Sequence, residues 1–173
     1  WREMYKPFGV IPMAGGNSGA QFAGWFKKEI HTIDDLKGLK MRIPGLAGEV
    51  LQRAGAVPVT LTGGEIFSSL QSGAIDATEW VGPYNDLAFG FYQAADYYYS
   101  SIWHEPGTGL EFLINEKAYN QLPADLQKIV EVAARAVNES TLDDYNAKNN
   151  AALQTLMSKH NVKMRTLPAP VIA

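Results

Sequence analysis

The stretch LKMRIPGLAGEVLQRAGAVPVTL, residues 39–61, decides the fold class of this chain. Residues 39–43 alternate between apolar and basic side chains, the second basic one being Arg42, and a Pro-Gly pair follows them. This pattern predicts a strand and the turn that ends it. Residues 46–54 suit a short helix that ends at a glycine in the left-handed cap position. Residues 57–61 predict a second strand. A strand, a helix and a strand in succession are typical of an α/β protein.

The alternation of strands and helices continues beyond this stretch. Pro58 assigns its strand to an edge or a strand start, because proline cannot donate to a ladder. Residues 63–71 predict a helix that stops at Gly73, and residues 74–79 predict a third extended run. Residues 112–115 predict another strand, at a chain reversal or a crossing between lobes.

A long helical pattern occupies residues 123–157. Pro123 fits the first helical turn. Apolar residues then recur at helical spacing, at Leu126, Ile129, Val130, Ala133 and Val137. Because about 34 residues is long for one globular helix, we expect a kink or break near residues 138–141.

Composition excludes several classes of function. Among 173 residues, 46% are hydrophobic and 19% charged, as in a globular protein, and the net charge of −3 argues against nucleic-acid binding. No apolar run reaches the roughly 18 residues needed to cross a bilayer, so we expect no direct membrane insertion. The absence of cysteine excludes disulfides, thiolate catalysis and cysteine-held metals.

The two ends indicate an internal fragment. The chain opens at Trp1 with neither an initiator methionine nor a signal-peptide core, and it stops in the proline-marked residues 167–173. The missing targeting segment therefore says little about export.

The sequence contains few of the motifs that are typical of enzymes. The chain has no nucleophile elbow, phosphate loop or dinucleotide fingerprint. His31, His104 and His160 are not at metal-binding spacing, and the glycine-rich residues 15–19 favour a flexible turn. We therefore predict no catalytic residues.

Three places could hold a small anion. Arg42, in an apolar strand pattern, is either a surface residue or a two-pronged clamp on a carboxylate. Glu79 and Trp80 end an extended run, where α/β folds place ligand contacts, although a solvated acid beside a core tryptophan is an equal alternative. Trp103 and Glu105 form a further aromatic–acid pair before a turn. Together these residues are more typical of a small-anion pocket than of an active site.

Two ordered motifs carry a resemblance to a known family. Residues 34–44, DDLKGLKMRIP, resemble the signature of the solute-binding subunits of tripartite ATP-independent periplasmic (TRAP) transporters. Residues 64–80, GEIFSSLQSGAIDATEW, are similar to the second hallmark of that family, at the expected distance. The resemblance covers residues 19–167.

Within the family, residues 21–26, 79–83 and 103–107 are most similar to the branch that binds 2-oxo and 2-hydroxy monocarboxylates with a cation. The resemblance implies that Arg42 pairs with the substrate carboxylate. It also implies cation ligation by the amide oxygen of Gln21, the carboxylates of Glu79 and Glu105, and the main-chain carbonyl of Trp80. The substrate-binding set that it implies is Arg42, Gln21, Glu79, Trp80 and Trp103.

The implied fold is the two-lobed α/β clamshell of periplasmic binding proteins, here lacking most of the first lobe. We assign residues 1–18 to a first-lobe crossing or hinge, residues 19–111 to the second lobe, and residues 112–173 to a return strand, a long lobe-spanning helix and a final strand. The resemblance implies a periplasmic protein that delivers its ligand to membrane permease subunits. A homodimer through the long helix is a further expectation.

The implied ligands are all oxygens, which favours a hard cation such as Na⁺ or Ca²⁺ and no organic cofactor. Two glutamates and a monocarboxylate contribute three negative charges and Arg42 offsets one, so the count leans towards a divalent ion. Two alternatives stay open: a metal-assisted 2-oxoacid lyase or decarboxylase, and a ligand-binding sensor domain.

Overall fold

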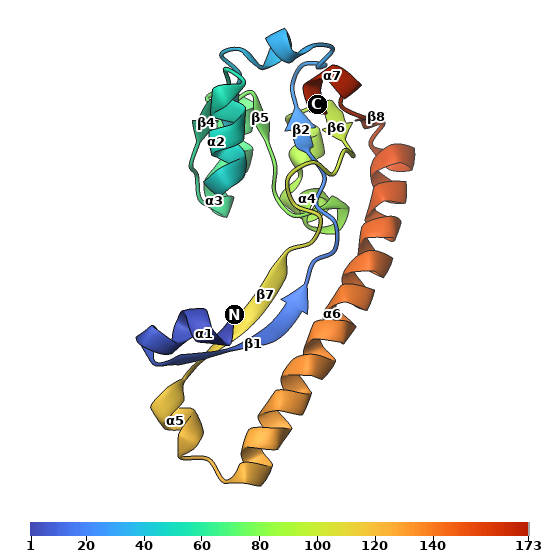
Figure 1. The fold of residues 1–173 in the computed structure, drawn as a ribbon. Coiled ribbons are helices and arrows are strands. Elements are labelled where there is room, and N and C mark those ends of the chain that lie inside the picture. Colours follow the sequence, from blue (N-terminus) through green and yellow to red (C-terminus); the bar gives the residue numbers. More distant parts are fainter. Residues whose placement is uncertain (173) are drawn as a thin grey trace. The chain divides into compact units, whose positions relative to one another are not determined.

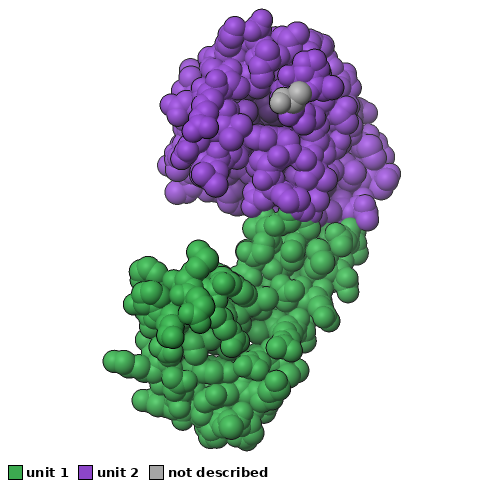
Figure 2. Space-filling view, in the orientation of Figure 1, with its two compact units in different colours: residues 1–19, 107–147 green, residues 20–106, 148–173 purple. Residues whose placement is uncertain are grey.

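The computed structural model describes residues 1–172. It divides into two compact units, shown in separate colours in Figure 2. Unit 1 comprises residues 1–19 and 107–147, and unit 2 comprises residues 20–106 and 148–173. Every residue of the predicted ligand site falls in unit 2.

Unit 2 is built on a six-stranded mixed sheet (Figure 1). The strand order is β4-β3-β5-β2-β6-β8. In the middle of the sheet, β3 pairs in parallel with β4 and β5, whereas β2 runs antiparallel to both β5 and β6. The strands are β2 (Gly24–Phe26), β3 (Lys40–Arg42), β4 (Val57–Val59), β5 (Ala77–Thr78), β6 (Tyr97–Tyr99) and β8 (Lys163–Arg165).

Capping side chains, a proline and glycines set the ends of the helices in unit 2. A capping box formed by Thr62 and Glu65 begins α3, and Gly73 ends it at a φ of 80°. Pro83 occupies the first turn of α4. The helices are α2 (Gly45–Arg53), α3 (Gly63–Ser72), α4 (Pro83–Phe89) and α7 (Ala169–Ile172), with 3₁₀ turns at Ile33–Leu36 and Phe91–Gln93.

The core of unit 2 lies on both faces of the sheet, because successive strand residues point in opposite directions. Trp25 and Tyr98 belong to one buried cluster, in which their rings stack at a centroid distance of 4.1 Å. The next residues along the same strands, Phe26 and Tyr99, belong to the other cluster with Met41.

Unit 1 is smaller and has a small core. An antiparallel pair of strands, β1 (Val10–Asn17) and β7 (Gly109–Asn115), forms its sheet. Its core cluster consists of three buried residues, Met13, Tyr119 and Ala134. The remaining elements are α1 (Arg2–Tyr5), a 3₁₀ turn (Lys6–Phe8), α5 (Glu116–Asn120) and the first part of α6 (Ala124–Lys159).

The α/β prediction and most of its elements are confirmed. The predicted strand at residues 39–43 is β3, and the proline-bearing β4 is the outer strand of its sheet. One prediction is wrong: α6 is a single continuous helix of 36 residues, with no break at residues 138–141 (Figure 1). None of the helices within residues 1–172 is long and apolar enough to cross a membrane.

Candidate functional site

The site starts from two neighbouring parallel strands. Arg42 is the last residue of β3, and its register partner on β5 is Thr78, which directly precedes Glu79. The amide of Glu79 donates to the carbonyl of Arg42 at 3.2 Å. Because both strands run in the same direction, their carboxyl ends meet at one edge, which is where α/β sheets bind ligands.

Arg42 is a buried cation whose partner is Glu79. Only 9% of Arg42 is exposed. Its Nη1 donates to Glu79 Oε1 at 2.5 Å and to the Glu79 carbonyl at 3.3 Å, and its guanidinium carbon lies 5.0 Å from the Trp80 ring centroid. Nε donates to the carbonyl of Leu61 at 3.3 Å. The alternative of a surface-facing Arg42 is therefore wrong.

Glu79 is a buried carboxylate with both oxygens in use. Oε1 accepts from Arg42, and Oε2 accepts from the side-chain amide of Gln21. Burial raises the pKa of Glu79 to about 7 in spite of the Arg42 charge, and the nearby carboxylates of Glu105 and Asp86 push this pKa further up. The carboxylate of Glu79 is therefore short of positive charge, as expected of a group that takes up a cation.

A second segment brings Glu105 and His104 to Glu79. The amide of Gln21 donates to the carbonyl of Glu105 at 3.1 Å, which ties the two segments together. Ligating atoms of Glu79, His104 and Glu105 lie within 4.8 Å of one another. The structure thus places together Arg42, Glu79 and Glu105, which the sequence pattern singled out, and Gln21, which the family resemblance implied.

His104 is the member that sequence reasoning missed. The spacing of the three histidines argued against a metal-binding role for His104. Its position directly before Glu105 is the sequence signal that could have pointed to it. Burial lowers the pKa of His104, so its imidazole is neutral at pH 7. Its Nδ1 is buried and has no hydrogen-bond partner among the described residues. The ring offers a nitrogen ligand beside the two carboxylates.

These side chains line one wall of a cavity of about 350 Å³. Glu79, His104 and Glu105 form its polar side, and residues 43–47 form the other. A volume of this size suits a small organic acid with an ion or water.

The donor set fits a hard cation after one adjustment. Two carboxylates converge, and the buried one lacks full compensation, so a positive ion is electrostatically favoured there. Gln21 presents its amide nitrogen to Glu79, whereas ligation requires the amide oxygen. Rotation of the amide about its last bond exchanges the two atoms.

The structure does not bring Trp103 into this cluster. Its ring packs on His104 at 4.7 Å, but Trp103 also lines an apolar cavity of about 200 Å³ with Phe26 and Met41. The contact of Trp103 with substrate stays a prediction. Trp80 follows Glu79 directly, and its indole Nε1 is buried without a hydrogen-bond partner among residues 1–172.

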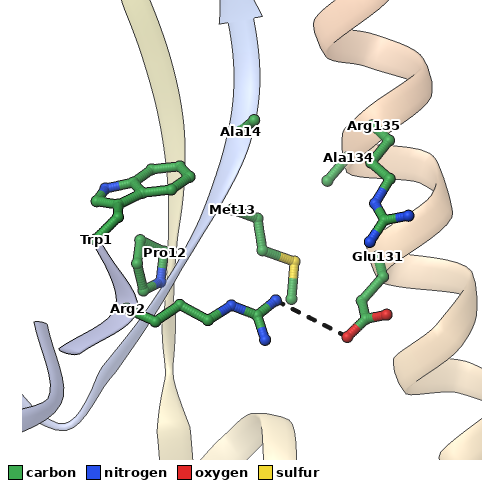
Figure 3. Close-up of a pocket in the computed structure, with 8 residues that line it drawn as sticks. All are labelled: Trp1, Arg2, Pro12, Met13, Ala14, Glu131, Ala134 and Arg135. Carbon is green, nitrogen blue, oxygen red and sulfur yellow. Dashed lines mark ion pairs between the residues drawn. The ribbon is translucent and has the colours of Figure 1, made fainter.

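Unit 1 has its own cavity, of about 190 Å³ (Figure 3). Its lining includes Trp1, Met13 and Arg135, and Arg2 extends towards Glu131 of α6 with a nitrogen–oxygen distance of 3.9 Å. The cavity contains none of the predicted ligand-binding residues.

Comparison with known proteins identifies the family. Residues 3–173 match the family described as bacterial extracellular solute-binding protein, family 7. The monocarboxylate 2-oxoacid-binding periplasmic protein of Nostoc sp. is 48% identical over 157 residues, which are 91% of this chain and 43% of that protein.

Two solved structures of TRAP periplasmic solute-binding proteins are each 49% identical and match 98% of this chain and 52% of their own. The protein from Colwellia psychrerythraea, with bound calcium and pyruvate, gives a TM-score of 0.93. The protein from Pseudoalteromonas atlantica, with bound sodium and pyruvate, gives 0.91. The chain therefore spans about half the length of these relatives, and it belongs to family 7 of the bacterial extracellular solute-binding proteins.

Proposed function

We propose that this protein is the periplasmic solute-binding subunit of a TRAP transporter and captures a small 2-oxo or 2-hydroxy monocarboxylate together with Na⁺ or Ca²⁺. The observation that carries the proposal is the meeting of Arg42 with Glu79, Gln21 and Glu105 at one strand edge. The pyruvate and cation bound by the two related structures give the ligand class.

The residues divide the work of binding by charge. Arg42 would take the substrate carboxylate, because its planar fork matches two carboxylate oxygens. Glu79 and Glu105 would face the cation with the amide oxygen of Gln21 and the Trp80 main-chain carbonyl. A bound cation would supply positive charge to the carboxylate and the 2-oxygen of the acid. Substrate leaves chemically unchanged, so the proposed protein is not an enzyme.

Glu79 would exchange partners when the site fills. In the structure, its two oxygens accept hydrogen bonds from Arg42 and Gln21. A Glu79 carboxylate that held a cation would leave the Arg42 guanidinium available to the substrate carboxylate. Arg42 thereby keeps a negative partner in both states, which avoids leaving a buried charge uncompensated. Binding of cation and acid would therefore be mutually reinforcing.

Charge favours a divalent ion in this scheme. Glu79, Glu105 and a monocarboxylate carry three negative charges, and Arg42 offsets one. Ca²⁺ neutralises the remainder, whereas Na⁺ leaves one uncompensated charge. The delivery of ligand to membrane permease subunits and the homodimer through α6 are parts of the proposal that rest on the family alone.

Calorimetry with pyruvate tests the function. We expect binding in CaCl₂ or NaCl, and binding weaker by at least tenfold in a sodium-free buffer that contains EDTA. Arg42→Ala should weaken binding by more than tenfold, because removal of one partner from a buried ion pair costs about 3–5 kcal/mol. Arg53→Ala, at an exposed arginine on α2, is the matched control and should leave affinity unchanged.

Two outcomes would contradict the proposal. One is equal pyruvate affinity in Arg42→Ala and wild-type protein, and the other is pyruvate binding that stays unchanged when both sodium and calcium are removed. NMR of the same pyruvate mixtures distinguishes the enzyme alternative, since a lyase or decarboxylase would consume the acid.

A further inference from the structure

We propose that Asp86 is the positioning residue of the cation site: its buried carboxylate clamps the backbone that directly follows Glu79 and Trp80. The inference rests on the proposed function and extends it to a residue outside the ligand set. Asp86 lies in α4, and only 2% of it is exposed.

One oxygen of Asp86 holds the ligand-bearing loop. Oδ1 accepts from the backbone amides of Val81 at 3.3 Å and Gly82 at 3.2 Å. These amides come immediately after Glu79 and Trp80, the residues proposed to present a carboxylate and a carbonyl. Fixing two successive amides restricts the backbone dihedrals that set where both groups point.

The other oxygen anchors the clamp to the sheet. Oδ2 accepts from the indole Nε1 of Trp25 at 2.9 Å and from the hydroxyl of Tyr98 at 2.8 Å. Trp25 and Tyr98 are register partners on β2 and β6, and both are fully buried. Trp25 is also the register partner of Thr78, which precedes Glu79. The hydrogen bond from Trp25 therefore connects Asp86 to β2, the strand that pairs with β5 beside the site.

A carboxylate is the side chain that this arrangement requires. All four groups donate, so the residue between them must accept on both oxygens, which asparagine cannot do because its nitrogen is a donor. The four donors are neutral, and a buried carboxylate is costly without a cation. The negative charge of Asp86 also favours the binding of a cation at the neighbouring Glu79.

The competing explanation is that Asp86 only stabilises the core. The two explanations differ in whether a variant of Asp86 weakens calcium binding alone or weakens calcium and pyruvate binding together. Asp86→Asn turns a donor towards Trp25 and removes the charge, so we expect calcium affinity to fall at least tenfold. Weak pyruvate binding in EDTA, which depends on Arg42, should change less than threefold. A purely structural role would lower both together.

Tyr98→Phe is the matched control. It removes one bond to Asp86 and leaves both bonds to the loop, so calcium affinity should stay within threefold of wild type even though stability falls. Calcium affinity that drops equally in Tyr98→Phe and Asp86→Asn would overturn the positioning role.

Hydrogen exchange of the wild-type protein tests the clamp without any variant. In EDTA, the amides of Val81 and Gly82 should be protected to the same degree as those of β5. Protection that appears only after calcium is added would overturn the inference. If wild-type protein shows no cation-dependent pyruvate binding, the proposed function fails, whereas unchanged calcium affinity in Asp86→Asn defeats the clamp alone.

Discussion

At the residue scale, the buried acid Asp86 sets a pH dependence of stability. Burial raises its pKa to about 6, because the four donors around it offset only part of the desolvation cost. The folded protein therefore holds this proton more tightly than the unfolded chain does. The stabilising contribution of protonated Asp86 is complete below about pH 4 and is lost as the pH rises through about 6.

Urea unfolding in EDTA measures this contribution. Between pH 5 and pH 8, the unfolding free energy of wild-type protein should fall relative to that of Asp86→Asn by on the order of 1–2 kcal/mol. The variant keeps every other titrating group, so the comparison removes the effects that the two proteins share. It leaves in the change at Glu79, whose pKa the charge of Asp86 raises. A difference that stays constant with pH would show that Asp86 keeps an ordinary pKa.

Sequence reasoning reached some of these residues and not others, for physical reasons. Arg42 and Glu79 follow predicted strands, and the carboxyl end of a strand is a recognisable ligand position. Asp86 could not be found, because its donors Trp25 and Tyr98 are 61 and 12 residues away in the chain. Burial that arises from such distant partners leaves no local pattern.

At the element scale, β2 depends on one glycine. Gly24 has a φ of 120°, and a Cβ atom there would lie 2.2 Å from the carbonyl oxygen of Thr78. That oxygen belongs to the neighbouring strand, so it cannot move aside without shifting β5 and the Glu79 that follows. Any other residue at position 24 is thus strained by both its dihedral and its neighbour.

Gly24→Ala should therefore destabilise unit 2 by several kcal/mol, on the order of 3 or more, or abolish its folding. Gly64→Ala is the control, since Gly64 is helical and its added Cβ meets nothing within 4 Å. That control should be neutral or stabilising by about 0.5–1 kcal/mol. Tryptophan fluorescence in urea reports both, and a Gly24→Ala loss below about 1 kcal/mol would contradict the strain argument.

The elements also show where pattern reasoning stops. Pro58 predicted an outer strand correctly, because its missing amide acts locally. The break expected in α6 rested only on length, and the helix instead continues through Thr141, whose hydroxyl donates to the carbonyl of Val137 at 2.6 Å. The length of a helix in a protein depends on the tertiary contacts along it, and the spacing of apolar residues in the sequence does not reveal those contacts.

At the scale of the whole molecule, the two units differ in how much apolar surface they bury. Unit 2 has two core clusters, anchored by residues such as Trp25 and Met41, whereas the cluster of unit 1 has three buried residues. Apolar side chains of unit 1 remain exposed, among them Phe112 at 45%, Leu113 at 56% and Ile129 at 60%. Because stability follows buried apolar area, unit 1 should open at lower free energy.

Hydrogen exchange read by mass spectrometry tests this ranking. In the 173-residue chain, amides of β1 and β7 should exchange faster than those of β2 and β6. Calcium with pyruvate at about 100 times the dissociation constant should add up to about 2.7 kcal/mol of protection in unit 2, where all the proposed ligands lie, and little in unit 1. Equal protection of all four strands, or a ligand effect spread evenly over both units, would mean that the units unfold as one and that the argument from buried area is wrong.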